Sequence, residues 1–295
     1  MDGVLVLAGP TASGKTDLAI ALAQRFDAEI IGADSRQIYR GMPIGTAAPD
    51  DAQLAAVQHH LIGFLDPRQR YSAGRYARDA RAAIAAIRAR GKRVIVTGGT
   101  GFYVRALTGD VRLASQYDEA LRDRLAHEAN LHPPEFLHEW LRLHDASRAN
   151  ALDPNDTYRV LRALEVSLAP EIERDESVPE PPAPGVHYLK VFLDIPLDEN
   201  DRKIAVRTDA MLSAGLVEEA ERIGADAVAA TAVGYPQALA YARGWSTREE
   251  LREALARATR RYARRQRGWF RREPETRWLP PEDVECAARE LLGWS

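Results

Sequence analysis

An eight-residue segment near the start of the chain has the composition and spacing of a phosphate-binding loop. Residues 9–16 read GPTASGKT and fit the pattern G-x-x-x-x-G-K-[ST] in full. Backbone N–H groups of such a loop point at phosphate oxygens, Lys15 adds a positive charge, and Thr16 can hold Mg²⁺. The whole segment is therefore predicted to bind phosphate groups: Gly9, Pro10, Thr11, Ala12, Ser13, Gly14, Lys15 and Thr16.

The flanks of this loop support the same interpretation. An apolar run at residues 4–7 reads as a strand, and residues 16–25 have a helical pattern. The helix would add the positive end of its dipole to the site. The loop is typical of nucleotide-binding proteins, ATP-binding ones included. By itself it leaves open which phosphate compound binds and whether a phosphoryl group moves.

A carboxylate follows the second apolar run of the chain. P-loop NTPases usually carry an Asp after a later strand, where it holds Mg²⁺. Residues 93–97 instead lead into Gly98-Gly99-Thr100, and only the run at 28–33 ends in an acid, Asp34. The sequence predicts Asp34 beside the loop, at the carboxyl edge of a parallel sheet, where such folds bind ligands. Two interpretations remain open, a reactive carboxylate and a turn cap.

Basic residues are concentrated near the C-terminus. Residues 257–272 read RATRRYARRQRGWFRR, with eight arginines and no acid, although the formal net charge of the chain is −3. The arginines lie off the apolar stripe of a predicted helix, and neighbouring guanidinium groups repel one another unless an anion lies across them. Either the run is a solvated helix face or it binds the phosphates of a nucleic acid. We favour the nucleic acid.

Strand and helix patterns alternate over the first hundred residues, which predicts an α/β fold with a P-loop NTPase-like parallel sheet flanked by helices. Residues 60–64 are expected to form a short third strand, residues 188–195 to rejoin the sheet, and the tail to be helical. Between 113 and 170 only helical patterns occur, and residues 175–185 are acidic and proline-rich. We predict a catalytic core, residues 1–112 and 186–295, and a helical insertion, residues 113–185, that ends in a proline-rich linker.

Composition limits the class of protein. The chain has 295 residues and no apolar run near the roughly 18 residues that a membrane span needs. No signal peptide is recognisable, and the lone Cys286 cannot form an internal disulfide. A cytoplasmic monomer without membrane contact is expected.

Several segments together resemble one family, the tRNA dimethylallyltransferases (tRNA isopentenyltransferases). They are GPTASGKT, AEIIGADSRQIYRGMPIGTAAP, HHLIGFLDP, YSAGRYARDA, GGTGFYVRAL, DPNDTYRVLRALEV, AVGYPQAL and TRRYARRQRGWFRR. The resemblance implies transfer of a dimethylallyl group from dimethylallyl diphosphate to N6 of an adenosine in the tRNA anticodon loop, at position 37, with release of pyrophosphate. It also implies tRNA, through its anticodon stem-loop, as partner and Mg²⁺, on Thr16, as cofactor.

The resemblance assigns roles to individual residues. Asp34 would take the N6 proton, and Thr11, Arg207 and Lys15 would act on the diphosphate, which residues 9–16 hold. The segments that match the family's tRNA contacts, together with the arginine run, comprise Asp34, Ser35, Arg36, Gln37, Thr100, Tyr158, Arg159, Val160, Leu161, Arg162, Arg261, Arg264 and Arg265. The chain departs from the family pattern at Ala48 and Gly63 and in the shortened stretch 168–200.

Three other functions share parts of the pattern. An ATP-dependent small-molecule kinase would use the same loop and sheet but leaves the arginine run unexplained. A prenyltransferase acting on free AMP or ATP would need neither the insertion nor the arginines. An RNA-binding protein with an inactive loop would bind tRNA without turnover.

Overall fold

The phosphate loop joins a fully buried strand to a helix that is buried only on its apolar side, at Ala19, Ile20, Leu22 and Ala23. The structure is a computed structural model that describes residues 3–109, 119–168 and 186–295. The chain divides into two units, residues 1–111 with 180–295 and residues 112–179. We call the first the core unit and the second the inserted unit. The predicted proline-rich linker, 175–185, lies outside the described residues.

The core unit is built on one six-stranded sheet in which every pairing is parallel. Its order is β3-β2-β4-β1-β5-β6. The strands are β1 (Val4–Ala8), β2 (Ala28–Gly32), β3 (His59–His60), β4 (Arg93–Gly98), β5 (Tyr188–Leu193) and β6 (Thr276–Leu279). This confirms the predicted α/β fold class with a parallel sheet.

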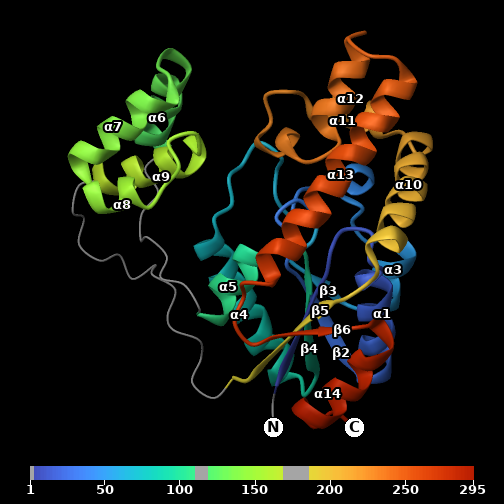
Figure 1. The fold of residues 1–295 in the computed structure, drawn as a ribbon. Helices are drawn as coiled ribbons and strands as arrows, with labels where there is room; N and C mark the ends of the chain where they lie inside the picture. Colours follow the sequence, from blue (N-terminus) through green and yellow to red (C-terminus); the bar gives the residue numbers. More distant parts are fainter. Residues whose placement is uncertain (1–2, 110–118, 169–185) are drawn as a thin grey trace. The chain divides into compact units, whose positions relative to one another are not determined.

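Helices cover both faces of this sheet (Figure 1). Those of the core unit are α1 (Lys15–Arg25), α2 (Pro43–Thr46), α3 (Asp51–Ala56), α4 (Ala73–Ala89), α5 (Gly101–Thr108), α10 (Leu197–Ser213), α11 (Leu216–Ile223), α12 (Tyr235–Ala242), α13 (Arg248–Phe270) and α14 (Val284–Leu292), with 3₁₀ turns η1 (Val228–Thr231) and η2 (Pro281–Asp283). Alternate strand residues point to opposite faces. Leu5 and Leu7 therefore pack with α1 and α14, whereas Val4 and Val6 pack with α4 and α5.

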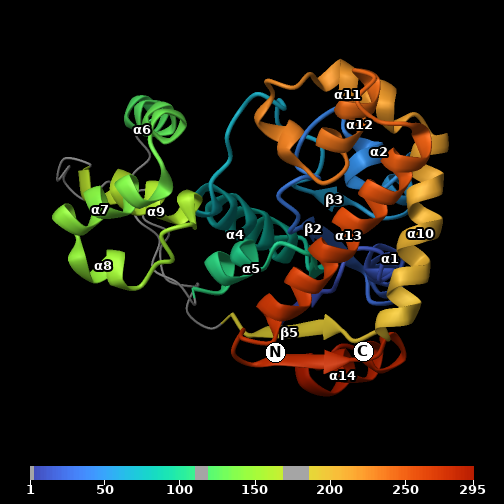
Figure 2. The same ribbon diagram turned by 45° about the horizontal axis from the view of Figure 1, so that its top comes forward.

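A third apolar cluster joins α11, α12 and η1 to the segment that follows β2. Ile38, Tyr39 and Met42 are buried there against Leu216 and Tyr235. Figures 1 and 2 show α13 running from the end near α11 and α12 toward the strands. Helix α13 begins at a capping box formed by Thr247 and Glu250.

Two of the expected elements differ from the structure. The third strand is only His59–His60, because Leu61 and Gly63 adopt positive φ angles of 58° and 61° and end the extended backbone. The tail is not wholly helical, since β6 adds a strand beside β5. Strand β4 lies between β1 and β2 in the sheet.

The inserted unit contains four described helices, α6 (Glu119–Leu131), α7 (Pro134–His144), α8 (Ala146–Asn150) and α9 (Thr157–Leu168). They enclose a small apolar core in which Leu137, Leu141, Val160 and Leu164 are fully buried. This agrees with the helical patterns predicted over these residues. Among the described residues of both units, no helix is long and apolar enough to cross a membrane.

Candidate active site

The phosphate loop connects β1 to α1, and its conformation follows from its sequence. Gly14 has φ 82° and caps α1 without a side-chain hydrogen bond. The first-turn N–H groups of α1 are therefore open to an external acceptor. An anion is the acceptor such a helix start favours. Ala12 also has a positive φ, 63°, an unusual conformation for a residue with a side chain.

Not every amide of the loop points toward a ligand. The N–H of Thr11 donates to Oε1 of Gln266 at 2.8 Å, and the N–H of Ser13 donates to the carbonyl of Pro10 at 3.2 Å. These two amides are used within the protein. Thr11 can contribute its hydroxyl to a ligand, while the open amides belong to the residues that begin α1.

Two residues of α10 contact Thr11. Nη1 of Arg207 lies 3.4 Å from Oγ1 of Thr11, and Nδ2 of Asn200 donates to the Thr11 carbonyl at 2.9 Å. Helix α10 packs on α13. The structure thus brings together Thr11 and Arg207, which are 196 positions apart in the sequence.

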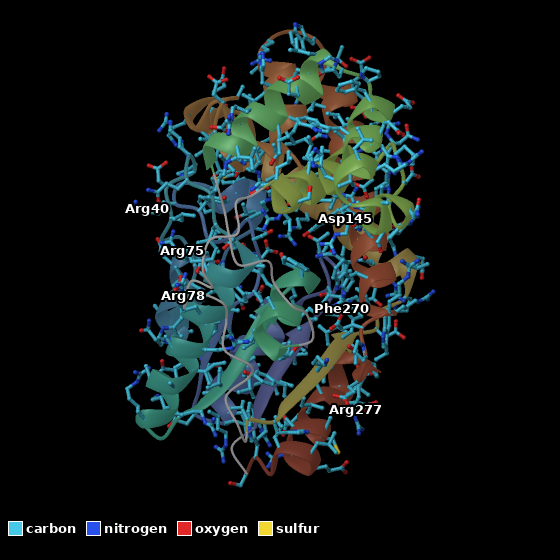
Figure 3. The ribbon with its side chains drawn as sticks, turned by 90° about the vertical axis from the view of Figure 1, so that its left-hand side faces the viewer. Arg40, Arg75, Arg78, Asp145, Phe270 and Arg277 are labelled. Atoms are coloured by element: carbon cyan, nitrogen blue, oxygen red, sulfur yellow. The ribbon has the colours of Figure 1, made fainter. Side chains whose placement is uncertain are left out.

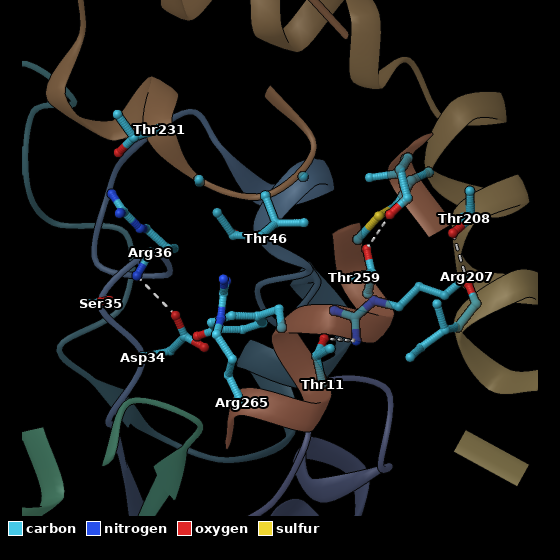
Figure 4. A pocket seen from close by; sticks show the side chains of 17 residues that line it. Thr11, Asp34, Ser35, Arg36, Thr46, Arg207, Thr208, Thr231, Thr259 and Arg265 are labelled. Carbon is cyan, nitrogen blue, oxygen red and sulfur yellow. Dashed lines mark hydrogen bonds between the residues drawn. The ribbon is translucent and has the colours of Figure 1, made fainter. Parts of the chain in front are cut away.

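Asp34 follows β2, and its two carboxylate oxygens have different surroundings. Its Oδ1 accepts the N–H of Arg36 at 2.9 Å, as in a turn cap. Its Oδ2 accepts no hydrogen bond from any residue that the structure describes. The carboxylate also lines a cavity together with Thr11 and Arg207. It is therefore held in place by one oxygen and presents the other to the cavity (Figure 4).

The cavity has a volume of about 220 Å³ and lies wholly within the core unit. Six residues that the sequence analysis assigned to the site line it: Thr11, Asp34, Ser35, Arg36, Arg207 and Arg265. Residues that the sequence analysis did not single out complete it, some with hydroxyls and some apolar. They are Gly45, Thr46, Ile204, Thr208, Met211, Thr231, Ala232, Val233, Leu255, Thr259 and Tyr262. Charged groups enter the wall from the segment after β2 and from both helices, α10 and α13, which also supply apolar side chains such as Met211 and Leu255.

Burial lowers the pKa values of the basic groups here. The pKa of Lys15 falls to about 8 because the group is buried and lies near Arg207, although the nearby Asp34 favours its charged form. Burial likewise lowers the pKa of Arg207. Both shifts mean that the positive charges lack an adequate counter-ion in the free protein. An anionic ligand would supply one.

Other predicted residues stabilise the surroundings of Asp34. Thr100 accepts the N–H of Ser35 at 2.9 Å through its Oγ1. Gln37 donates Nε2 to the carbonyls of Thr46 and Ala47, at 3.2 and 2.9 Å. Gln37 and Thr100 therefore do not line the cavity, and they hold the loop on which Asp34 and Arg36 lie.

The arginine run is mostly exposed, but acids from outside the run lie against part of it. Arg261 and Arg265 are exposed, and Arg265 lines the cavity. Arg264 pairs with Asp201 at 3.3 Å, and Arg267 pairs with Asp194 at 2.8 Å. Acids of α10 and of the segment after β5 therefore relieve part of the repulsion within the run, and binding of a nucleic acid by the other arginines stays a prediction. Exposed arginines also occur elsewhere, among them Arg75 and Arg277 (Figure 3).

The predicted tRNA contacts of the inserted unit lie on α9. Tyr158 is 71% exposed, and Arg159 and Arg162 pair with Asp156 and Glu165. Val160 is fully buried in the apolar core of this unit, and Leu161 packs against that core. The side chain of Val160 therefore cannot contact RNA, which corrects that part of the prediction. Contact by the other residues stays a prediction.

Sequence reasoning missed two residues that touch the loop, Gln266 and Asn200. Gln266 is 5% exposed, and Asn200 is 2% exposed. A signal for Gln266 existed, since it lies four residues from both Tyr262 and Phe270 on the inward face of α13. A polar residue on an apolar stripe needs a hydrogen-bonding partner. No comparable signal marked Asn200, which lies in the first turns of α10.

The metal prediction rests on Thr16. The Thr16 hydroxyl makes no hydrogen bond to any described residue and stands at the start of α1. Mg²⁺ commonly binds through one protein oxygen, substrate phosphates and water, which this position fits. Over residues 3–109, 119–168 and 186–295, no group of three His, Cys, Asp or Glu side chains could hold a metal alone. A metal here would need oxygens from the substrate.

Comparisons with known proteins agree on one family. The family model of the IPP transferases matches residues 37–273. A tRNA dimethylallyltransferase of Desulforudis audaxviator is 39% identical, over 98% of this chain and 96% of that protein. One from Anaeromyxobacter is 42% identical, over 98% of this chain and 97% of that protein. The crystal structure of the tRNA isopentenylpyrophosphate transferase from Bacillus halodurans is 32% identical, with a TM-score of 0.71 over 99% and 96% of the two chains.

Proposed function

This chain belongs to the IPP transferase family, and we propose that it transfers a dimethylallyl group from dimethylallyl diphosphate to an adenine of tRNA. The acceptor atom is N6 of an anticodon-loop adenosine, position 37. One observation carries the assignment to this site: the carboxylate of Asp34, the hydroxyl of Thr11 and the guanidinium of Arg207 line a single cavity. A base, a hydrogen-bond donor and a cation converge there, as prenyl transfer to nitrogen requires.

The reaction needs a base because the amine is a poor nucleophile. The N6 lone pair is delocalised into the purine ring, and the nitrogen becomes acidic as it bonds to carbon. N6 attacks C1 of the dimethylallyl group, the C1–O bond breaks, and its electron pair leaves with pyrophosphate. Oδ2 of Asp34 accepts the N6 proton, which typically gives about 10²- to 10⁴-fold in rate.

The leaving group needs positive charge and hydrogen-bond donors. Negative charge grows on the diphosphate as C1–O breaks, and Lys15, Arg207 and the open amides at the start of α1 favour that charge. Mg²⁺ on Thr16, when bound, would supply further charge neutralisation on the diphosphate oxygens. Since the group transfers to carbon rather than phosphorus, the Mg²⁺-binding Asp of ordinary P-loop NTPases is not needed.

The adenine must leave its stack to reach Asp34. Extruding a base costs a few kcal/mol in a duplex and less in a loop. A single-stranded loop is the usual target of such enzymes. The exposed arginines of α13 would hold the RNA backbone, and Arg36 and Arg265 lie at the cavity itself. We propose tRNA as the physiological acceptor on this ground.

Mass spectrometry of unmodified tRNA tests the function. The pure protein is incubated with Mg²⁺ and dimethylallyl diphosphate, with AMP and ATP offered in parallel reactions. We expect one C5 unit on an anticodon-loop adenosine, with one pyrophosphate released for each. Prenylated AMP without prenylated tRNA, or a phosphorylated product, would contradict the assignment.

A further inference from the structure

Two buried amide side chains hold the backbone of Thr11 from opposite sides. Asn200, on α10, donates Nδ2 to the Thr11 carbonyl at 2.9 Å. Gln266, on α13, accepts the Thr11 N–H through Oε1 at 2.8 Å. Gln266 also donates Nε2 to the carbonyl of Gly99 at 3.0 Å. The loop residue is thereby tied to two helices and to the end of β4.

The surroundings indicate that these contacts are specific. A buried amide that lacks a hydrogen bond is costly, so Asn200 and Gln266 depend on the partners they have. The chain also leaves room for Gln266, since a Cβ atom on Gly99 would lie 1.9 Å from its Nε2. Any residue other than glycine at position 99 would push Gln266 away from Thr11.

The consequence concerns the Thr11 hydroxyl. Because both backbone groups of Thr11 are occupied, its hydroxyl is the polar group left to face the cavity, where Arg207 lies 3.4 Å away. A shift of the backbone by a few tenths of an ångström would move the hydroxyl relative to the diphosphate. Displacement of about 1 Å at a reacting group costs on the order of 10²-fold in rate.

We propose that Asn200 and Gln266 are positioning residues that act through Thr11. They fix its hydroxyl beside Arg207, at the place where the bridging oxygen of the leaving diphosphate takes up charge. Neither touches the substrate. The inference deepens the proposed function and rests on it for its rate measurement.

Asn200→Asp is the direct test, because it keeps the size of the side chain and replaces the donor with an oxygen that repels the Thr11 carbonyl. We expect kcat for prenyl transfer to fall about 10- to 100-fold, with the KM for tRNA unchanged. We expect the same result, a lower kcat with an unchanged KM for tRNA, from two further variants. Asn200→Ala adds no charge, and Gln266→Glu loses the donor to the Gly99 carbonyl. Gln24→Glu, on the exposed side of α1, adds the same charge and serves as the control.

A double-mutant cycle separates positioning from general support of the fold. In a Thr11→Ala background there is no hydroxyl to place, so Asn200→Asp should lower kcat by less than about twofold further. If the two losses multiply instead, Asn200 acts on the fold as a whole and the proposal is wrong. Wild-type kcat in both Asn200 variants would also overturn it.

The affinity for inorganic pyrophosphate in the presence of Mg²⁺, measured by calorimetry, can be determined without prenyl transfer. We expect Asn200→Asp to weaken it about tenfold, and Thr11→Ala to abolish that difference. If wild-type protein prenylates no tRNA, the proposed function fails, and the pyrophosphate cycle still decides whether Asn200 acts through Thr11. Equal pyrophosphate affinity in wild type and Asn200→Asp contradicts the positioning role.

Discussion

Nη1 of Arg207 lies 3.4 Å from Oγ1 of Thr11, so a cation of α10 and a hydroxyl of the phosphate loop meet at one point of the cavity wall. Burial lowers the pKa of Arg207, while Asp34 acts in the opposite direction. The guanidinium thus lies in a site that favours an added anion. We therefore expect the positive charge of Arg207 to matter when the diphosphate leaves.

Arg207→Gln should therefore lower kcat for prenyl transfer by about 10²- to 10³-fold, the cost of losing one donor aimed at developing charge. Steady-state kinetics with saturating tRNA measure it. Arg202→Gln is the matched control, because Arg202 lies on the same helix but is exposed and pairs with Asp198. Comparable losses of kcat in both variants would show that Arg207 has no specific role in the reaction.

The lowered pKa of Lys15 predicts a pH dependence for diphosphate binding. Lys15 is charged below pH 8 and loses its proton above it, because burial has lowered its pKa to about 8. A bound diphosphate favours the charged form, so above pH 8 binding must take up a proton. Affinity for pyrophosphate should therefore fall as pH rises above 8, by up to about tenfold per pH unit.

Lys15→Arg isolates this effect, because the guanidinium stays charged across the range. We expect its pyrophosphate affinity to show no break near pH 8, measured by calorimetry from pH 6.5 to 9.5. The ionisation of pyrophosphate itself is common to both proteins and cancels in the comparison. Parallel curves for wild type and Lys15→Arg would show that Lys15 does not carry the charge that holds the ligand.

The exposed arginines of α13 predict a salt-dependent affinity for tRNA. Replacing Arg261 and Arg265 with Ala should weaken binding and reduce the slope of log K against log salt by about two, one for each lost phosphate contact. Filter binding between 50 and 200 mM salt measures the slope. Arg277→Ala, an exposed arginine of the edge strand β6, should leave it unchanged. An equal slope in wild type, the double variant and Arg277→Ala would show that this helix face is a solvated surface that does not bind tRNA.

Substitution of Glu219 is expected to affect stability rather than catalysis. It is 1% exposed, and its carboxylate accepts the N–H groups of Ile44 and Gly45 and the hydroxyl of Tyr235. Glu219→Gln places an NH₂ group against one of these donors. The free energy of unfolding should fall by about 1–3 kcal/mol in urea titrations. Glu218→Gln, at the exposed neighbouring position, should stay within about 0.5 kcal/mol of wild type.

The parts of the site that local sequence determines could be predicted. The loop, its flanking strand and helix, and Asp34 at the end of β2 all follow from spacing within a few residues. The carboxylate could be placed but not its dual behaviour, since whether Oδ1 caps Arg36 depends on the turn that β2 enters.

Contacts between distant positions could not be predicted. Asn200 and Gln266 lie 189 and 255 positions from Thr11, and nothing near either residue specifies that pairing. The acids opposite Arg264 and Arg267 were missed for the same reason. Strand β6 has four residues, one of them the exposed Arg277, and depends on pairing with β5 rather than on its own pattern. In each case the stabilising partner lies far away in the sequence.

The single-turnover rate of Asp34→Asn tests the central claim most directly. The substitution keeps the oxygen that accepts the N–H of Arg36 and removes the base. With dimethylallyl diphosphate and tRNA both saturating, the rate of N6 prenylation should fall by about 10²- to 10⁴-fold. The Kd for tRNA should stay within a factor of two. A near-normal rate would contradict the account, because proton transfer would not then depend on Asp34.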